Sequence, residues 1–308
     1  MNNTIEAIRD GILKSKPRST NTIKFNQKIA YLKPDEYCCF VEGSTDPKFY
    51  FNISNYNFIK KIQYNNYLFV NNSKNENGGK LSVINTYLDI KELFSKYMNK
   101  CIFIVDHDYY GYSDINLPKN NHISMTEPYS FENYFLIDTN LEKIFIYYNI
   151  GDYYNGFYKM FNDFLEQIDD YNNYKFSTTR YFGFEGAKFK YHGIYDQNDI
   201  FSFKFSNNSF SFNKDKMIKE INNIKKTIDI WGRNPRNNIM GVNNDINYTY
   251  KKYSKKQEYF RGHIVYDFLD QYLRQIHNIN INNDYDKIVP LLDVKLLKVQ
   301  DGEGKELD

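Results

Sequence analysis

Two short acidic segments of this chain could do chemistry together. The sequence Glu-Gly-Ser-Thr-Asp at 42–46 follows an apolar run at 37–41, and Asp-His-Asp at 106–108 follows another at 101–105. Both runs have the length and composition of buried strands. Carboxylates that converge at one point repel each other, and Mg²⁺ relieves that repulsion by binding one or two of them while it keeps water and phosphate oxygens as further ligands. The two segments therefore predict a divalent-metal site for phosphodiester chemistry.

Five carboxylates are the candidate metal ligands. Asp106 and Asp108 are separated by one residue, so both side chains can point the same way and share an ion. Glu42 could be a further ligand or the base that takes a proton from water. Asp46 could equally cap the helix that follows it or reach the metal, and Glu132 could complete a second metal position or be an ordinary first-turn Glu of a helix. We expect one or two ions of Mg²⁺ or Mn²⁺.

Lys80 is the candidate cation of the site. It follows Gly78 and Gly79 at the predicted start of a helix, where backbone amides and the helix dipole could bind a phosphate. A Gly-Gly turn alone is a weak signal, and the chain has no Gly-x-x-x-x-Gly-Lys-Ser/Thr sequence of the kind that binds nucleotides. We predict that Lys80 neutralises charge on the scissile phosphate.

The elements that must position these residues alternate along the first half of the chain. Apolar runs predict four short strands, and amphipathic stretches between them predict helices. Alternation of this kind predicts an α/β fold with a parallel sheet covered on both faces. In such a sheet the functional crevice lies at the carboxyl ends of the strands, which is where the acidic segments stand. The predicted strands are 37–41, 67–71, 101–105 and 122–125, and the predicted helices are 46–54, 80–97 and 129–136.

The pattern changes near residue 140, so we predict three parts. Residues 1–36 form an N-terminal extension with a helix and a strand-like stretch, 37–139 form the catalytic domain, and 140–308 form a mainly helical domain for dimerisation or substrate binding. The long helices of the last part are expected at 153–171, 214–231 and 255–277. The acidic, glycine-containing tail at 301–308 is expected to fray.

Composition adds constraints but no function. Lys and Arg exceed Asp and Glu by only two, 40 against 38, so a nucleic-acid surface would have to be a local groove. The three cysteines, Cys38, Cys39 and Cys101, lie in apolar runs without zinc-ligand spacing and are expected to be reduced core thiols. No run has the features of a signal peptide or the roughly 20 apolar residues that span a bilayer. We therefore expect a soluble cytoplasmic protein with no membrane partner.

Basic residues of the second half are the candidates for nucleic-acid binding. They lie around Trp231, which could belong to an RNA surface but is more often a core residue at a helix end. The many Tyr and Phe residues could stack on unpaired bases, although most are expected to pack in the core. The candidate basic residues are Arg233, Arg236, Lys251, Lys252 and Arg261.

The acidic segments resemble the motifs of the TOPRIM domain, the Rossmann-like metal-binding fold of topoisomerases, bacterial primases and OLD-family nucleases. Phe-Val-Glu-Gly-Ser-Thr-Asp at 40–46 resembles the first motif, and Val-Asp-His-Asp at 105–108 resembles the second. The resemblance covers roughly 37–136. It implies a metal-dependent nuclease with Glu42 in acid/base or metal work and with Asp106 and Asp108 as metal ligands.

Two further segments, Gly-Gly-Lys at 78–80 and Ser-Phe-Glu-Asn-Tyr at 130–134, resemble a narrower TOPRIM-like branch that includes the effector of the PARIS anti-phage defence system. That resemblance implies a toxic nuclease held by an ABC-type ATPase and released on infection, with transfer RNA as target. The chain has no Walker motif, so the ATPase would be a separate protein. Arg-Gly-His at 261–263 stands where relatives would carry Gly-Lys, which leaves any late catalytic lysine unassigned; Arg261 or His263 could replace it, or neither.

We therefore predict a Mg²⁺-dependent TOPRIM endoribonuclease that cleaves transfer RNA and is a homodimer when active. One rival is an OLD-like nuclease that cuts DNA with the same site. A second rival is a non-catalytic TOPRIM module that binds nucleic acid or a partner, although clustered carboxylates without a metal would be costly. A phosphatase or nucleotidyltransferase of Asp-x-Asp type is disfavoured, because Tyr110 stands where haloacid-dehalogenase enzymes carry Thr or Val.

Overall fold

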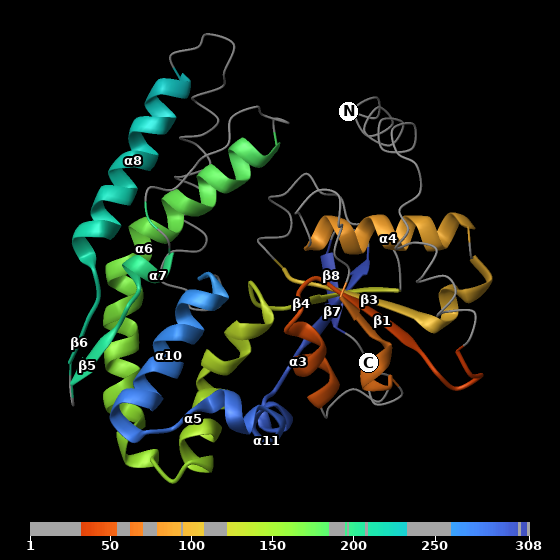
Figure 1. Cartoon of the computed structure of the whole chain (residues 1–308), viewed down its shortest axis with the longest axis horizontal. Helices are drawn as coiled ribbons and strands as arrows, with labels where there is room; N and C mark the ends of the chain where they lie inside the picture. Colours follow the sequence, from red (N-terminus) through yellow and green to blue (C-terminus); the bar gives the residue numbers. More distant parts are fainter. Residues whose placement is uncertain are drawn as a thin grey trace.

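A computed structural model describes 32–53, 62–69, 79–93, 95–107, 122–184, 195, 197–206, 209–232, 260–300 and 303–306. Within this part of the chain a central sheet has six strands in the order β2-β1-β3-β4-β7-β8 (Figure 1). The first four are parallel, and β7 and β8 are antiparallel to their neighbours. The α/β class predicted from alternating elements is therefore confirmed. The strands are β1 (Cys38–Val41), β2 (Tyr67–Phe69), β3 (Cys101–Val105), β4 (Ile123–Thr126), β7 (Leu296–Gln300) and β8 (Glu303–Glu306).

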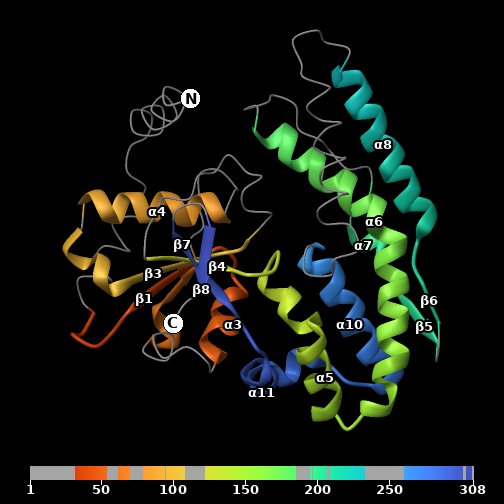
Figure 2. The same cartoon turned by 180° about the vertical axis from the view of Figure 1, so that it is seen from behind.

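Strand residues alternate between two buried clusters on opposite faces of the sheet. Cys38 and Phe40 of β1 pack with Phe103 of β3 beneath α4 (Lys80–Leu93), where the Phe40 and Phe103 rings stack 4.8 Å apart. Cys39 and Val41 belong to the cluster on the other face, which includes α3 (Asp46–Asn52). Figures 1 and 2 show α4 and α3 on opposite sides of the sheet. The continuous apolar runs seen in the sequence follow from burial of both faces.

The remaining helical elements of the described residues connect these strands or form the second half of the chain. The predicted helix at 129–136 is a 3₁₀ helix, η4, and the long stretches predicted as helices are present as α6, α8 and α10. The other bounds are η2 (Tyr64–Asn66), η3 (Ser95–Lys100), η4 (Phe131–Leu136), α5 (Asp138–Tyr147), η5 (Gly151–Tyr153), α6 (Tyr154–Phe184), α7 (Gln197–Ile200), α8 (Lys214–Gly232), α10 (Gly262–His277), η7 (Ile281–Asp284), α11 (Tyr285–Ile288) and η8 (Val289–Leu291).

The last strands of the chain differ from the sequence prediction. We expected the tail at 301–308 to fray, but Glu303–Glu306 forms β8 and pairs with β7, which in turn pairs with β4. The sequence of β8, Glu-Gly-Lys-Glu, has no apolar residue, so its strand depends on backbone pairing that leaves no hydrophobic pattern to detect. The sheet therefore draws on residues from both sides of the predicted 139/140 boundary.

Aromatic side chains join the helical half to the sheet. The short hairpin of β5 (Lys204–Ser206) and β6 (Ser209–Ser211) lies against α10. Phe164 of α6 stacks on Phe268 of α10 at 4.6 Å and touches Phe203 edge-on at 5.1 Å. One buried cluster runs from β1 and α3 through η4 to α6 and α10. These rings are core residues, as expected for most of the aromatic side chains.

The described residues include all three cysteines and the helices named above, so two expectations about them can be compared with the structure. Cys38, Cys39 and Cys101 are all buried and free of disulfides. Among the helices of the described residues, none combines the length and apolar character needed to cross a bilayer. The predicted N-terminal helix and nearly all of the strand-like stretch at 22–32 lie outside the described residues.

Candidate active site

Glu42 and Asp106 lie together at the carboxyl ends of neighbouring strands. Glu42 follows β1 and Asp106 follows β3, and these two strands pair in parallel with Phe40 opposite Phe103. Oε1 of Glu42 accepts a hydrogen bond of 2.8 Å from the backbone N–H of Asp106. Both residues are partly exposed. The sequence prediction that two strands bring acidic residues to one edge of the sheet is therefore confirmed for this pair.

The start of α4 completes one side of this edge. Gly79 has a φ of +88°, and a Cβ built on it would lie 3.6 Å from Oε2 of Glu42. A left-handed φ favours glycine at this position. Lys80 is the first residue of α4; it is buried, and its Nζ donates to the carbonyl oxygen of His107 at 3.1 Å. Lys80, the cation predicted to neutralise a phosphate, therefore contacts the acidic loop that follows β3.

The loop after β1 is held by Asp46. Its Oδ2 accepts a 2.8 Å hydrogen bond from the backbone N–H of Gly43, and a Cβ on Gly43 would lie 2.5 Å from Oδ1. Thr45, not Asp46, is the N-cap of α3. Asp46 therefore closes the loop that carries Glu42 and does not cap the helix, and Gly43 is required for this close approach.

The pKa of Asp46 is raised to about 6, mainly by burial; hydrogen bonds from the backbone of Gly43 and the rest of the loop lower it, and the nearby carboxylate of Glu132 raises it. The buried phenol of Tyr50, on α3, has a raised pKa because of its burial and then because of Asp106, Asp46, Tyr134 and Glu42. Carboxylates that follow β1 and β3, and those of α3 and η4, therefore gather in one region.

Asp46→Asn is expected to stabilise the metal-free protein at neutral pH. The folded-state pKa is about 6 against an ordinary 3.8, so the folded protein binds more protons than the unfolded chain between these values and its stability falls as pH rises through them. At about 1.4 kcal/mol per pKa unit, the cost of the ionised group is at most about 3 kcal/mol. Asn can still accept from Gly43 without this cost.

Urea unfolding in the presence of chelator, at pH 7.5 and near pH 4, measures this effect. The variant should exceed wild type by roughly 1 to 3 kcal/mol at pH 7.5 and by little near pH 4. Asp152→Asn, on exposed Asp152 in η5, is the matched control. A variant that gains nothing at pH 7.5 relative to pH 4 would refute the electrostatic account of Asp46.

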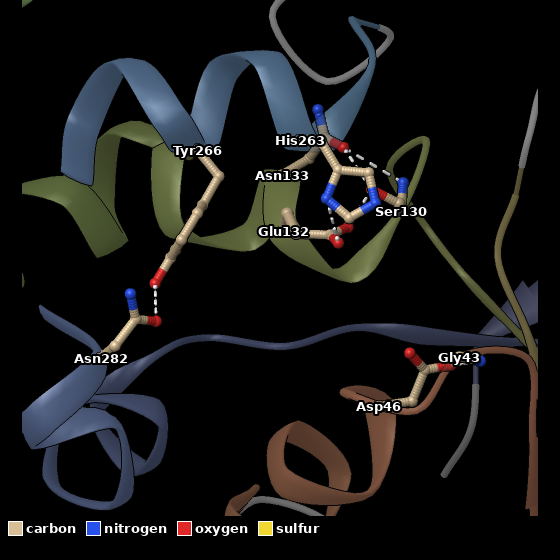
Figure 3. A network of polar contacts seen from close by, with 8 residues as sticks. All are labelled: Gly43, Asp46, Ser130, Glu132, Asn133, His263, Tyr266 and Asn282. Carbon is tan, nitrogen blue, oxygen red and sulfur yellow. Dashed lines mark hydrogen bonds and ion pairs between the residues drawn. The ribbon is translucent and has the colours of Figure 1, made fainter. Parts of the chain in front are cut away.

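Glu132 lies in a polar network that joins η4 to the start of α10 (Figure 3). Only 8% of its side chain is exposed. Oε2 accepts from the Ser130 hydroxyl at 2.5 Å, and Oε1 lies 3.2 Å from Nδ1 of His263. Asn133 accepts from the backbone N–H of Ser130 and donates to the carbonyl of Phe260 at 2.9 Å. Ser130 is the N-cap of η4.

The residues fit a hard divalent cation in chemistry, since the donors at the sheet edge are carboxylates. Crowding of Asp46 by Glu132 is the kind of repulsion that a cation relieves. Among the described residues, however, no three His, Cys, Asp or Glu side chains form a ready-made metal cluster. Asp108, the predicted partner of Asp106, lies outside the described residues. Within the described part of the site, Glu42 and Asp106 are therefore the residues that would bind the metal.

The predicted nucleic-acid residues are described only in part. Arg233, Arg236, Lys251 and Lys252 lie outside the described residues, as does the side chain of Trp231. Arg261 is the N-cap of α10 and is partly exposed, and its charge lowers the otherwise raised pKa of Tyr171 on α6. The charge of Arg261 therefore lies near α6.

Neither a comparison with protein-family models nor a comparison with curated proteins gives a match. What the site can do chemically therefore has to follow from its own residues.

Sequence reasoning identified the acidic loops but not two supports around them. Thr126, at the end of β4, accepts from the backbone N–H of His107 at 2.9 Å, and His263 stands against Glu132. These partners are 19 and 131 residues apart in the chain, so no local pattern marks them.

Proposed function

We propose that this protein is a Mg²⁺-dependent TOPRIM-type endoribonuclease. The observation that carries the proposal is the hydrogen bond from the Asp106 backbone to Glu42, because it joins the two acidic motifs at the carboxyl ends of adjacent parallel strands. The site lies where ligands bind in open α/β sheets. The resemblance of 40–46 and 105–108 to TOPRIM motifs supports the same assignment.

Glu42, Asp106 and Asp108 would hold the divalent cation, with Asp46 close enough to add negative charge. When bound, the ion supplies positive charge against phosphate oxygens and a Lewis acid for water activation. Oε1 of Glu42 is held by the backbone N–H of Asp106, and the carboxylate would serve as a ligand of the ion or as the base that takes a proton from the attacking water. Lys80, held against the carbonyl of His107, places a cation beside the acidic loop. Because both oxygens of Glu132 already face protein donors, we leave Glu132 out of the ligand set.

Within this proposal the protein is a toxic effector of anti-phage defence that cleaves transfer RNA when a separate ABC-type ATPase releases it. This part of the proposal rests on the segments at 78–80 and 130–134, which resemble the TOPRIM-like branch that includes the PARIS effector. We propose that the active form is a homodimer, since a folded RNA is larger than one such sheet edge. An OLD-like DNA nuclease is the second candidate, because the carboxylates act on phosphodiesters of either nucleic acid and contacts to the 2′-hydroxyl decide between them.

Cleavage assays on purified full-length chain test the function. Total transfer RNA and plasmid DNA are incubated separately with Mg²⁺, with Mn²⁺ and with chelator. RNA fragments that form only with a divalent ion are the expected result. Cleavage of DNA alone would favour the alternative that the protein is a DNA nuclease. No cleavage of either, by chain alone or with a co-expressed ATPase partner, would overturn the catalytic assignment in favour of a binding module.

A further inference from the structure

The structure places an exposed imidazole on a buried carboxylate beside the acidic edge of the sheet. His263 is 78% exposed, whereas the Glu132 side chain beneath it is 8% exposed. The two groups come from η4 and from the first turn of α10, which are 131 residues apart in sequence. An exposed ion pair on a surface needs no explanation, but here one partner is buried and is anchored from its other side by Ser130.

The contact fixes which ring nitrogen is available. A carboxylate oxygen is an acceptor, and Oε1 of Glu132 lies 3.2 Å from Nδ1 of His263, so this contact engages Nδ1 as the donor. Nε2 is therefore the nitrogen that exchanges a proton with solvent or substrate. The same orientation by a carboxylate is what makes an imidazole an effective acid or base in enzymes.

The pair belongs to the same region as the predicted metal ligands. The charge of Glu132 raises the pKa of Asp46. The pKa of Tyr285 is raised mainly by its burial, then by Tyr266, and also by both Glu132 and Asp46. Figure 3 draws Glu132 and His263, on η4 and α10, in one view with the loop that carries Gly43 and Asp46. Asp267, one turn along α10, is the further titratable group that faces His263, and its pKa is raised to about 6 mainly by burial.

We propose that His263 is the general acid of the phosphodiester cleavage and that Glu132 is its positioning residue; this rests on the proposed nuclease function. As water attacks phosphorus and the P–O bond to the leaving sugar breaks, Nε2 donates its proton to the departing oxygen. The attacking water gives a proton to Glu42 or to solvent, and His263 regains one from bulk water. Glu42, directly after β1, and His263, in the first turn of α10, come from separate elements of the fold.

The decisive test compares two leaving atoms. Oligoribonucleotides that wild type cleaves are made with oxygen or with sulfur at the leaving position, because a thiolate departs without protonation. His263→Ala should lose about 100-fold in rate or more on the oxygen substrate, and less than about 10-fold on the sulfur substrate. Added imidazole should restore part of the rate, since the exposed position leaves room for it. His277→Ala, at the other end of α10, is the matched control.

Each outcome decides the role. Equal losses on both substrates, or no loss on the oxygen substrate, would overturn the general-acid assignment while the nuclease function stands. Glu132→Gln should reproduce a smaller part of the selective loss and should not respond to imidazole. Failure of wild type to cleave any nucleic acid would instead overturn the proposed function itself.

Discussion

Glu42→Gln is expected to abolish metal-dependent cleavage, with a loss of about 100-fold or more. The amide oxygen of Gln can still accept from the backbone N–H of Asp106, so the bond of 2.8 Å between the two strand ends can persist. The substitution removes only the charge that a cation needs and the basicity that a proton acceptor needs. Initial rates on the substrate that wild type cleaves, with Mg²⁺ at saturation, measure the loss.

The same variant should also lose its response to metal. A ligand that binds only the folded protein raises the free energy of unfolding in proportion to its affinity, so Mg²⁺ should raise the melting temperature of wild type more than that of Glu42→Gln. Glu142→Gln, on exposed Glu142 of α5, is the matched control for both measurements. Unchanged cleavage by Glu42→Gln would remove Glu42 from the mechanism, whatever the metal response.

The sheet and its acidic edge were predictable because the signals are local. Cys-Cys-Phe-Val before Glu42 and Cys-Ile-Phe-Ile-Val before Asp106 are short apolar runs, and each ends at a carboxylate. Burial on both faces of the sheet explains why these runs are continuous instead of alternating. Parallel pairing then brings the ends of the runs to one edge, which is where Glu42 meets Asp106.

The parts that sequence did not predict depend on pairings across long stretches of chain. β7 joins the sheet beside β4 with Leu297 opposite Met125, and nothing in the local pattern of either strand specifies the other. The role of Asp46 was left open between a cap and a ligand. In the structure Asp46 accepts a hydrogen bond from Gly43 and does not cap the helix. This contact depends on the conformation of the loop, which the residue types alone do not specify.

His263 illustrates the same limit at the site. The sequence marked its segment only as a departure from the pattern of relatives. Its partner Glu132 was interpreted as a metal ligand or as a first-turn residue of a helix, and both alternatives rest on position in a local element. The contact between them exists because α10 packs on η4, which is a property of the folded core.

That packing leads to the last prediction, in which Gly262→Ala separates His263 from Glu132. A Cβ on Gly262 would overlap the hydroxyl of Ser130 and would lie 2.8 Å from Oε2 of Glu132 and 3.0 Å from Oδ1 of Asn133. All three atoms belong to buried groups held by hydrogen bonds, so they cannot move at low cost. We expect a loss of about 1 to 3 kcal/mol in the free energy of unfolding together with the selective rate loss of His263→Ala.

Gly156→Ala is the matched control, because Gly156 lies in α6 with no atom within 4 Å of a built Cβ. Alanine in a helix is favoured over glycine by up to about 1 kcal/mol, so this variant should be as stable as wild type or more so. Urea unfolding and the paired oxygen and sulfur substrates distinguish the two changes. If Gly262→Ala were destabilised but kept its full rate on the oxygen substrate, close docking of α10 on η4 would serve folding alone, and the assignment of Glu132 as a positioning residue would be wrong.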